Sequence, residues 1–157
     1  MNWEIASALA EIVGAVAVVL TLAYLAVQIR QNTNAVKAAS HHAVTDSFNA
    51  LNVSVIQDPK VGRLWRLGNE GYANLTEDEQ VSFSFMMISY IRIFETLYYQ
   101  RKIGTMEEQL FLSEERTAQW MLTNLGFREW WAANPISFSP EFRKYIDTLI
   151  EKNYAAT

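Results

Sequence analysis

The chain opens with a long apolar run that carries no charge. Ile12 to Ile29 (IVGAVAVVLTLAYLAVQI) is a run of eighteen residues without Asp, Glu, Lys or Arg. At about 1.5 Å of rise per residue, a helix of this length covers about 27 Å, close to the ~30 Å hydrocarbon thickness of a bilayer. The run predicts one transmembrane helix, which we assign to residues 1–30.

Two other interpretations of this run are a secretory signal peptide and a buried helix of a soluble bundle. A signal peptide has a basic start and a small-x-small cleavage site. Here the start carries Glu4 and no Lys or Arg, and the run ends in LAYLAVQIRQ. Trp3 and Tyr24 are about 31 Å apart along a helix, which matches the aromatic belts at the two faces of a membrane. A transmembrane helix is therefore favoured.

Helical spacing of apolar residues continues beyond the run, and neither Pro nor Gly occurs between Gly14 and Pro59. Ile29, Val36, Val44 and Phe48 keep a helical period. We expect one helix from about Trp3 to Gln57, in which the polar residues 31–57 form a stalk.

The rest of the chain, residues 58–157, is predicted to be a small helical bundle. Asp58 followed by Pro59 is typical of an N-cap and a first helical position, and Gly68 would end that helix. The last predicted elements are a helix from a Thr105–Glu108 capping box to Leu125, a short helix over 127–133, and a helix capped by Ser139 from Pro140 to about Asn153.

The helix predicted over residues 77–102 is apolar nearly all round, and Thr76 and Glu79 open it with a capping box. A second transmembrane span is the alternative, but Arg92, Glu95 and several serines interrupt it. We expect the central, buried helix of the bundle, with Arg92 and Glu95 paired as a structural ion pair rather than acting in catalysis. With no strand pattern in the sequence, the predicted fold class is all-α.

A stripe of smaller and more polar residues follows one side of the first helix. Its members recur at alternating steps of four and three, the 3.5-residue period of a left-handed supercoil. Ala6, Ala10 and Gly14 form a small-xxx-small ridge beside it, which allows close helix approach. This seam consists of Ser7, Glu11, Gly14, Val18, Thr21, Leu25, Gln28 and Asn32.

Three interpretations of the seam remain open. It is an interface of a homo-oligomer without transport, the lining of a narrow pore, or a chance pattern on a monomeric anchor. Glu11 is its sharpest member, because an ionisable residue at membrane depth is a functional hypothesis by default. The alternative for Glu11 is a position at the outer interface, in water.

Composition narrows the function classes. The net charge of -4 disfavours nucleic-acid binding, and the absence of cysteine excludes thiolate chemistry. His41 and His42 are the only histidines, and Asp46 lies four residues after His42 on the same helix face. Such a pair could supply only two metal ligands, so a solvated helix face is the better interpretation. No Glu-x-x-His motif and no phosphate-binding Gly loop occurs. We therefore expect no cofactor, no metal and no enzymatic activity.

Two further groups stand out. Four glutamates are expected to form a solvated acidic face. The aromatic segment GFREWWAANPISFSPEF is expected to pack in the core, and the alternative for this segment is a partner-binding patch. The four glutamates are Glu107, Glu108, Glu114 and Glu115.

Orientation follows from the basic residues near the span. Arg30 and Lys37 follow it, and no Lys or Arg precedes it. The positive-inside rule then predicts a single-pass protein of the cell inner membrane with its C-terminal domain in the cytoplasm.

Three segments carry a resemblance. VGAVAVVLTLAYLAVQIRQNT, FREWW and FSPEFRKYID resemble a set of uncharacterised bacterial membrane-anchored proteins with one N-terminal transmembrane helix. The resemblance implies a bacterial source and an N-terminal span, and it implies no activity, cofactor or site residue.

The sequence thus predicts a non-enzymatic bitopic membrane protein. It would self-assemble into a homo-oligomer through its first helix and present a cytoplasmic helical domain to a partner protein. The alternative is a small homo-oligomeric channel lined by the seam. A membrane-tethered enzyme is disfavoured, because no catalytic constellation is visible.

Overall fold

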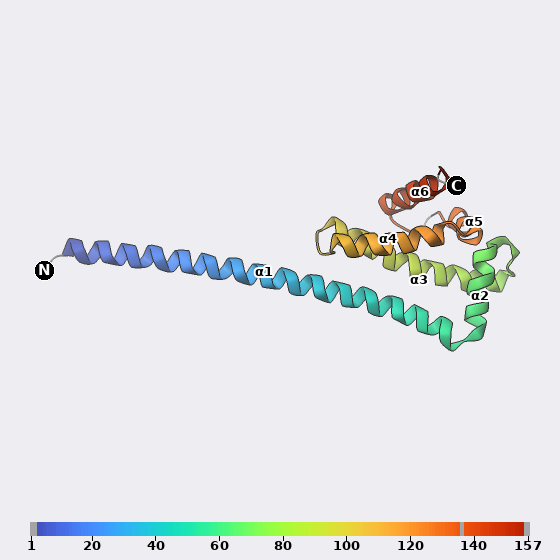
Figure 1. The fold of residues 1–157 in the computed structure, drawn as a ribbon, viewed down its shortest axis with the longest axis horizontal. Coiled ribbons are helices and arrows are strands. Elements are labelled where there is room, and N and C mark those ends of the chain that lie inside the picture. The colour runs from blue at the N-terminus through green and yellow to red at the C-terminus, as the bar shows by residue number, and fades with distance from the viewer. Residues whose placement is uncertain (1–2, 136, 156–157) are drawn as a thin grey trace. The chain divides into compact units, whose positions relative to one another are not determined.

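The computed structural model describes residues 3–135 and 137–155, and over these residues the chain is helical without strands, which confirms the all-α prediction (Figure 1). The elements are α1 (Trp3–Gln57), α2 (Pro59–Glu70), the 3-10 turn η1 (Tyr72–Asn74), α3 (Glu77–Lys102), α4 (Glu108–Leu122), α5 (Leu125–Ala133) and α6 (Pro140–Ala155).

The chain divides into two compact units between Ala39 and Ser40. In the first unit, every described residue belongs to α1 and is exposed. Within the described residues, α1 is the one helix that is long and apolar enough to cross a membrane, and none of its eighteen-residue apolar window is buried. The single candidate span agrees with the prediction from the sequence.

The second unit begins inside α1. Val44 is 6 % exposed and belongs to the core, and the Phe48 ring lies 5.4 Å from the ring of Tyr90 on α3. The Tyr90 ring lies in turn 6.1 Å from Trp65 on α2. Residues 40–57, which the sequence assigns to the stalk, therefore contribute side chains to the core of the bundle.

Helix α3 is the central element of the second unit, packed against α2 and α4. One of its faces is buried from Phe83 to Leu97, at steps of three and four residues. The Phe94 ring stacks on Phe111 of α4 at 6.0 Å and meets Phe142 of α6 edge-on at 5.9 Å. The apolar residues of this buried face are Phe83, Met87, Ile91, Phe94 and Leu97.

Two predicted helix starts are confirmed. The Asp58 carboxylate accepts a hydrogen bond from the Lys60 backbone N–H at 2.8 Å. Thr76 and Glu79 form the reciprocal capping box, with the Glu79 N–H donating to the Thr76 hydroxyl and the Thr76 N–H donating to the Glu79 carboxylate. The bonds from Thr76 lower the pKa of Glu79, because they stabilise the charged carboxylate.

Helix α2 does not end at Gly68, as the sequence indicated, but continues to Glu70. Gly68 is a buried helical residue whose missing side chain leaves room for the Phe83 ring, which a Cβ atom would overlap. Gly126 of α5 lies against Gly68 where α5 crosses α2, and a Cβ atom on Gly126 would overlap the carbonyl oxygen of Gly68. Both glycines thus permit close packing, and the sequence signal for a helix end was wrong at Gly68.

The predicted bounds of α4 were also wrong at both ends. The Thr105 hydroxyl donates to the carbonyl of Gln100, and the Glu108 carboxylate pairs with Arg101 at 2.5 Å, so no capping box forms. The helix ends at Leu122 rather than Leu125, because the Thr123 hydroxyl and N–H both donate to the carbonyl of Trp120. Gly104, with φ of +77°, follows the end of α3 in the left-handed conformation that favours glycine.

The aromatic segment before α6 lies in the core, as predicted. Phe127 and Trp130 are fully buried, and Trp131 is 4 % exposed. The Trp131 indole N–H donates to Asp147 of α6 at 2.8 Å, and the Arg143 guanidinium lies 4.3 Å from the centre of the Trp131 ring. These contacts join α5 to α6 and favour core packing over an exposed aromatic patch.

The close crossing of α2 and α5 generates a first prediction. Gly126→Ala should lower the free energy of unfolding by at least about 2 kcal/mol, because the added methyl group overlaps backbone that cannot rotate away. The measurement is thermal unfolding of the detergent-solubilised protein, followed by near-ultraviolet circular dichroism. Gly62→Ala is the matched control, since its nearest contact is 3.4 Å and its stability should not fall. Equal melting of both variants would contradict the packing described here.

Candidate functional site

The predicted seam lies entirely on the part of α1 that belongs to the first unit. Taking 100° of rotation per residue, its eight members fall within an arc of about 100° on one side of the helix. All eight are exposed. They are Ser7, Glu11, Gly14, Val18, Thr21, Leu25, Gln28 and Asn32.

Two polar side chains of the seam are hydrogen-bonded within α1 itself. The Thr21 hydroxyl donates to the Ala17 carbonyl at 2.8 Å, and the Gln28 amide donates to the Tyr24 hydroxyl at 3.0 Å. A hydroxyl satisfied by its own backbone costs little in an apolar environment. The Thr21 hydroxyl therefore needs neither water nor a second helix as a partner.

Glu11 and Gly14 differ from these two residues. Among the described residues, no hydrogen bond or ion pair involves the Glu11 side chain. A Cβ atom built on Gly14 meets nothing within 4 Å, so the chain itself does not require glycine there. An exposed glycine in a helix interior costs about 1 kcal/mol relative to alanine. The contacts within the chain therefore give no reason for a glycine at this position.

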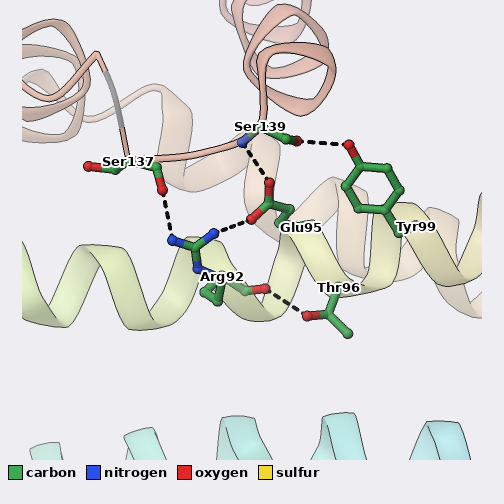
Figure 2. A network of polar contacts seen from close by, with 6 residues as sticks. All are labelled: Arg92, Glu95, Thr96, Tyr99, Ser137 and Ser139. Carbon is green, nitrogen blue, oxygen red and sulfur yellow. Dashed lines mark hydrogen bonds and ion pairs between the residues drawn. The ribbon is translucent and has the colours of Figure 1, made fainter.

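In the second unit, the pair predicted on α3 forms a network with the segment before α6 (Figure 2). Arg92 Nη1 lies 2.6 Å from Glu95 Oε2, and Arg92 Nη2 donates to the carbonyl of Ser137 at 2.7 Å. Glu95 Oε1 accepts from the Ser139 N–H at 2.9 Å, and the Ser139 hydroxyl and the Tyr99 hydroxyl lie 2.8 Å apart. Glu95 is only 7 % exposed.

This arrangement fits a structural role for Glu95. Both of its carboxylate oxygens are occupied, one by a guanidinium and one by a backbone N–H. The network holds the connection between α5 and α6 against α3. Ser139 precedes α6 as predicted, but its hydroxyl contacts Tyr99 rather than the helix start.

The predicted acidic face on α4 is only partly solvated. Glu108 pairs with Arg101, and the Tyr145 hydroxyl donates to the Glu115 carboxylate. Burial and this bond to Glu115 raise the pKa of Tyr145. Glu107 is exposed, whereas Glu114 is half-buried. The prediction failed for Glu115, which is half-buried and has a partner on α6, whereas Glu108 is exposed although it pairs with Arg101 of α3.

The two histidines lie near the start of the second unit, with their ring centres 6.1 Å apart. No group of three or more metal-ligating side chains occurs within residues 3–135 and 137–155. His41 instead borders a cleft of about 300 Å³ between the end of α1, α3 and α4, together with Tyr90 and Glu114.

Comparison with known proteins adds no relative. No family model, no curated protein and no solved structure matches this chain.

The structure thus offers two features with potential function. One is the seam with its apolar surroundings, which the sequence indicated through its 3.5-residue period. The other is the cleft beside Tyr90, which sequence reasoning missed. Its only local signal is the polar row of His41, Thr45 and Asn49, spaced by four residues on one face of α1. The other walls come from segments far away in the chain.

The network around Glu95 generates a second prediction. Glu95→Ala should lower the free energy of unfolding by about 2 kcal/mol, because it leaves the Ser139 N–H and Arg92 without this partner. Glu95→Gln should cost about 1 kcal/mol, since its amide oxygen still accepts from Ser139. Chemical denaturation followed by tryptophan fluorescence measures both.

Glu70→Ala is the control for this series. Glu70 pairs with Arg66 on the surface, where both side chains are more than half exposed, and such pairs contribute between about 0 and 1 kcal/mol. If Glu95→Ala were as mild as Glu70→Ala, the network would not hold the connection between α5 and α6.

Proposed function

We propose that this protein is a single-pass membrane protein that self-assembles through the seam on α1 and presents its helical second unit to a partner protein. The observation that carries the proposal is the apolar window of α1, none of which is buried. Apolar surface of this length is stable only when it is removed from water. Lipid covers the apolar surface on all sides of a helix, and a second copy of the chain covers it along one side.

Assembly is supported by the composition of the seam. Transmembrane helices associate through small residues that let their backbones approach, and Ala6, Ala10 and Gly14 supply such a ridge beside the seam. Gly14 has open space around it in its own chain. A neighbouring copy would fill that space, and two such helices would carry their polar positions on the shared side.

For orientation, we propose the inner membrane with the second unit in the cytoplasm. Arg30 and Lys37 lie on α1 just beyond the apolar window, and both are exposed. Basic residues close to a span favour the cytoplasmic side.

A partner is supported by an apolar strip on the outside of α3. Phe85 is 67 % exposed and Val81 is 57 % exposed, and both border a shallow hollow with Ile88. Large apolar side chains gathered on one exposed helix face are typical of protein contact sites. Binding a partner requires no catalytic group, so the proposal is non-enzymatic.

The second candidate is a pore lined by the seam. Glu11 favours it, because an ionisable side chain without a partner among the described residues suits a water-filled path. Val18 and Leu25 weigh against a pore, because in an oligomer their apolar side chains would surround the same path. We therefore rank it below the packing seam.

The assembly proposal yields a third prediction. Gly14→Leu should lower the mass of the detergent-solubilised oligomer towards that of the 18.0 kDa monomer, because a large side chain keeps the helices apart. Light scattering coupled to size-exclusion chromatography measures the mass. Since nothing in the chain lies within 4 Å of a Cβ on Gly14, a loss of assembly cannot come from a clash within one copy.

Ala23→Leu is the matched control. It makes a similar small-to-large change on an exposed residue about 180° around the helix from Gly14, so its oligomer should keep the wild-type mass. A monomeric wild type, or equal masses for all three proteins, would refute the seam. An ion flux in liposomes that changes with Glu11→Gln would show that the seam lines a pore rather than only packing helices together.

A further inference from the structure

The cleft beside Tyr90 lies wholly within the second unit and is built from three helices. Its lining comes from the end of α1, from Tyr90 of α3 and from α4, which contributes Glu114. Its volume of about 300 Å³ is at the lower end of the range for small-molecule sites. The inference that follows does not depend on self-assembly of α1.

One part of the lining is apolar and well packed. Val44 and Met106 are 6 % and 7 % exposed, and the rings of Phe48 and Tyr90 lie 5.4 Å apart. These side chains are held by the core around them, so the apolar surface of the cleft is already formed. An apolar group entering the cleft would lie against Phe48 and Tyr90 without displacing them.

Another part of the lining consists of polar side chains that have no partner within the described chain. In the part of the chain that the structure describes, no hydrogen bond or ion pair is made by the side chains of Asn49, Asn52, Tyr90 or Glu114. Polar groups that are partly removed from water normally find a partner. Of these four, Tyr90 and Glu114 are half-buried, whereas Asn49 and Asn52 are exposed to solvent. The two half-buried groups are therefore available to pair with a molecule that enters the cleft.

The charge of the lining selects the kind of molecule. Glu114 is the one Asp or Glu among the residues that border the cleft, and neither Lys nor Arg borders it. Burial, with a smaller contribution from the charge of half-buried Glu114, raises the pKa of Tyr90 to about 12. The Tyr90 hydroxyl therefore stays protonated and can donate a hydrogen bond, while Glu114 offers a negative charge beside an aromatic ring.

We propose that this cleft binds a small organic cation, an ammonium group on an apolar body. The ammonium pairs with the Glu114 carboxylate and faces the Tyr90 ring, a favourable arrangement for a cation. The apolar body covers Phe48 and Val44. Asn49 and Asn52 at the rim supply hydrogen bonds to any further polar group of the ligand.

The experiment uses the full chain in nanodiscs of zwitterionic lipid, with 2-phenylethylammonium as the probe and neutral 2-phenylethanol as its isostere. Isothermal titration calorimetry measures the Kd of each. Saturable binding of one phenylethylammonium per chain is expected, with the alcohol at least roughly tenfold weaker. Glu114→Gln should weaken the ammonium probe by roughly tenfold or more, because the charged acceptor is lost, and should leave the alcohol unchanged.

Glu151→Gln is the matched control, because it makes the same change of charge on an exposed residue of α6 outside the cleft. It should bind both probes as the wild type does. Thr45→Phe is a second variant, which fills the cleft from α1 without changing the charge and should abolish binding of both probes. If Glu114→Gln loses its helical circular dichroism and is therefore unfolded, Thr45→Phe still tests whether the probes bind in the cleft.

Three results would overturn the proposal. They are the absence of saturable binding by the ammonium probe, equal Kd values for the ammonium probe in the wild type and in a folded Glu114→Gln variant, and undiminished binding in Thr45→Phe. An equal loss in Glu151→Gln would also overturn it, because the attraction would then come from net charge rather than from the cleft.

Discussion

The structure depends first on one constraint, the removal of the apolar part of α1 from water. Burying a Val, Leu or Ile side chain stabilises a protein by about 1.5–3 kcal/mol, and the window from Ile12 to Ile29 consists largely of such residues. None of that window is buried. The seam covers only about 100° of the circumference, so contact with another copy would leave most of the apolar surface uncovered. Under the proposed function, a bilayer would cover the remainder.

The second unit satisfies the same constraint internally. Its core is built on the buried face of α3, and two features fix the other helices around it. The glycines at the crossing of α2 and α5 let the backbones approach, while Glu95 secures the connection between α5 and α6 through a guanidinium and a backbone N–H. The cleft beside Tyr90 lies where the end of α1 meets this core.

Local signals predicted much of the fold. The N-cap at Asp58 and the capping box at Thr76 act within one turn of helix, and the apolar run is continuous in the chain, so the sequence alone reveals all three. The failures involve distant partners. Gly68 was taken as a helix end although Phe83 explains it, and Glu108 was assigned to a cap although it binds Arg101. The cleft could not be predicted, because Tyr90 and Glu114 meet the end of α1 only in the folded bundle.

The central claim is that α1 crosses the membrane and leaves the second unit in the cytoplasm. The chain contains no cysteine, so single cysteines can be introduced along α1 in an otherwise unreactive background. Labelling by a membrane-impermeant maleimide is measured in right-side-out and inverted vesicles. The account predicts no labelling at positions 12–29 in either preparation, and labelling at exposed positions of the second unit only in inverted vesicles. Ready labelling within 12–29 would contradict the transmembrane assignment, and labelling of the second unit in right-side-out vesicles would contradict its orientation.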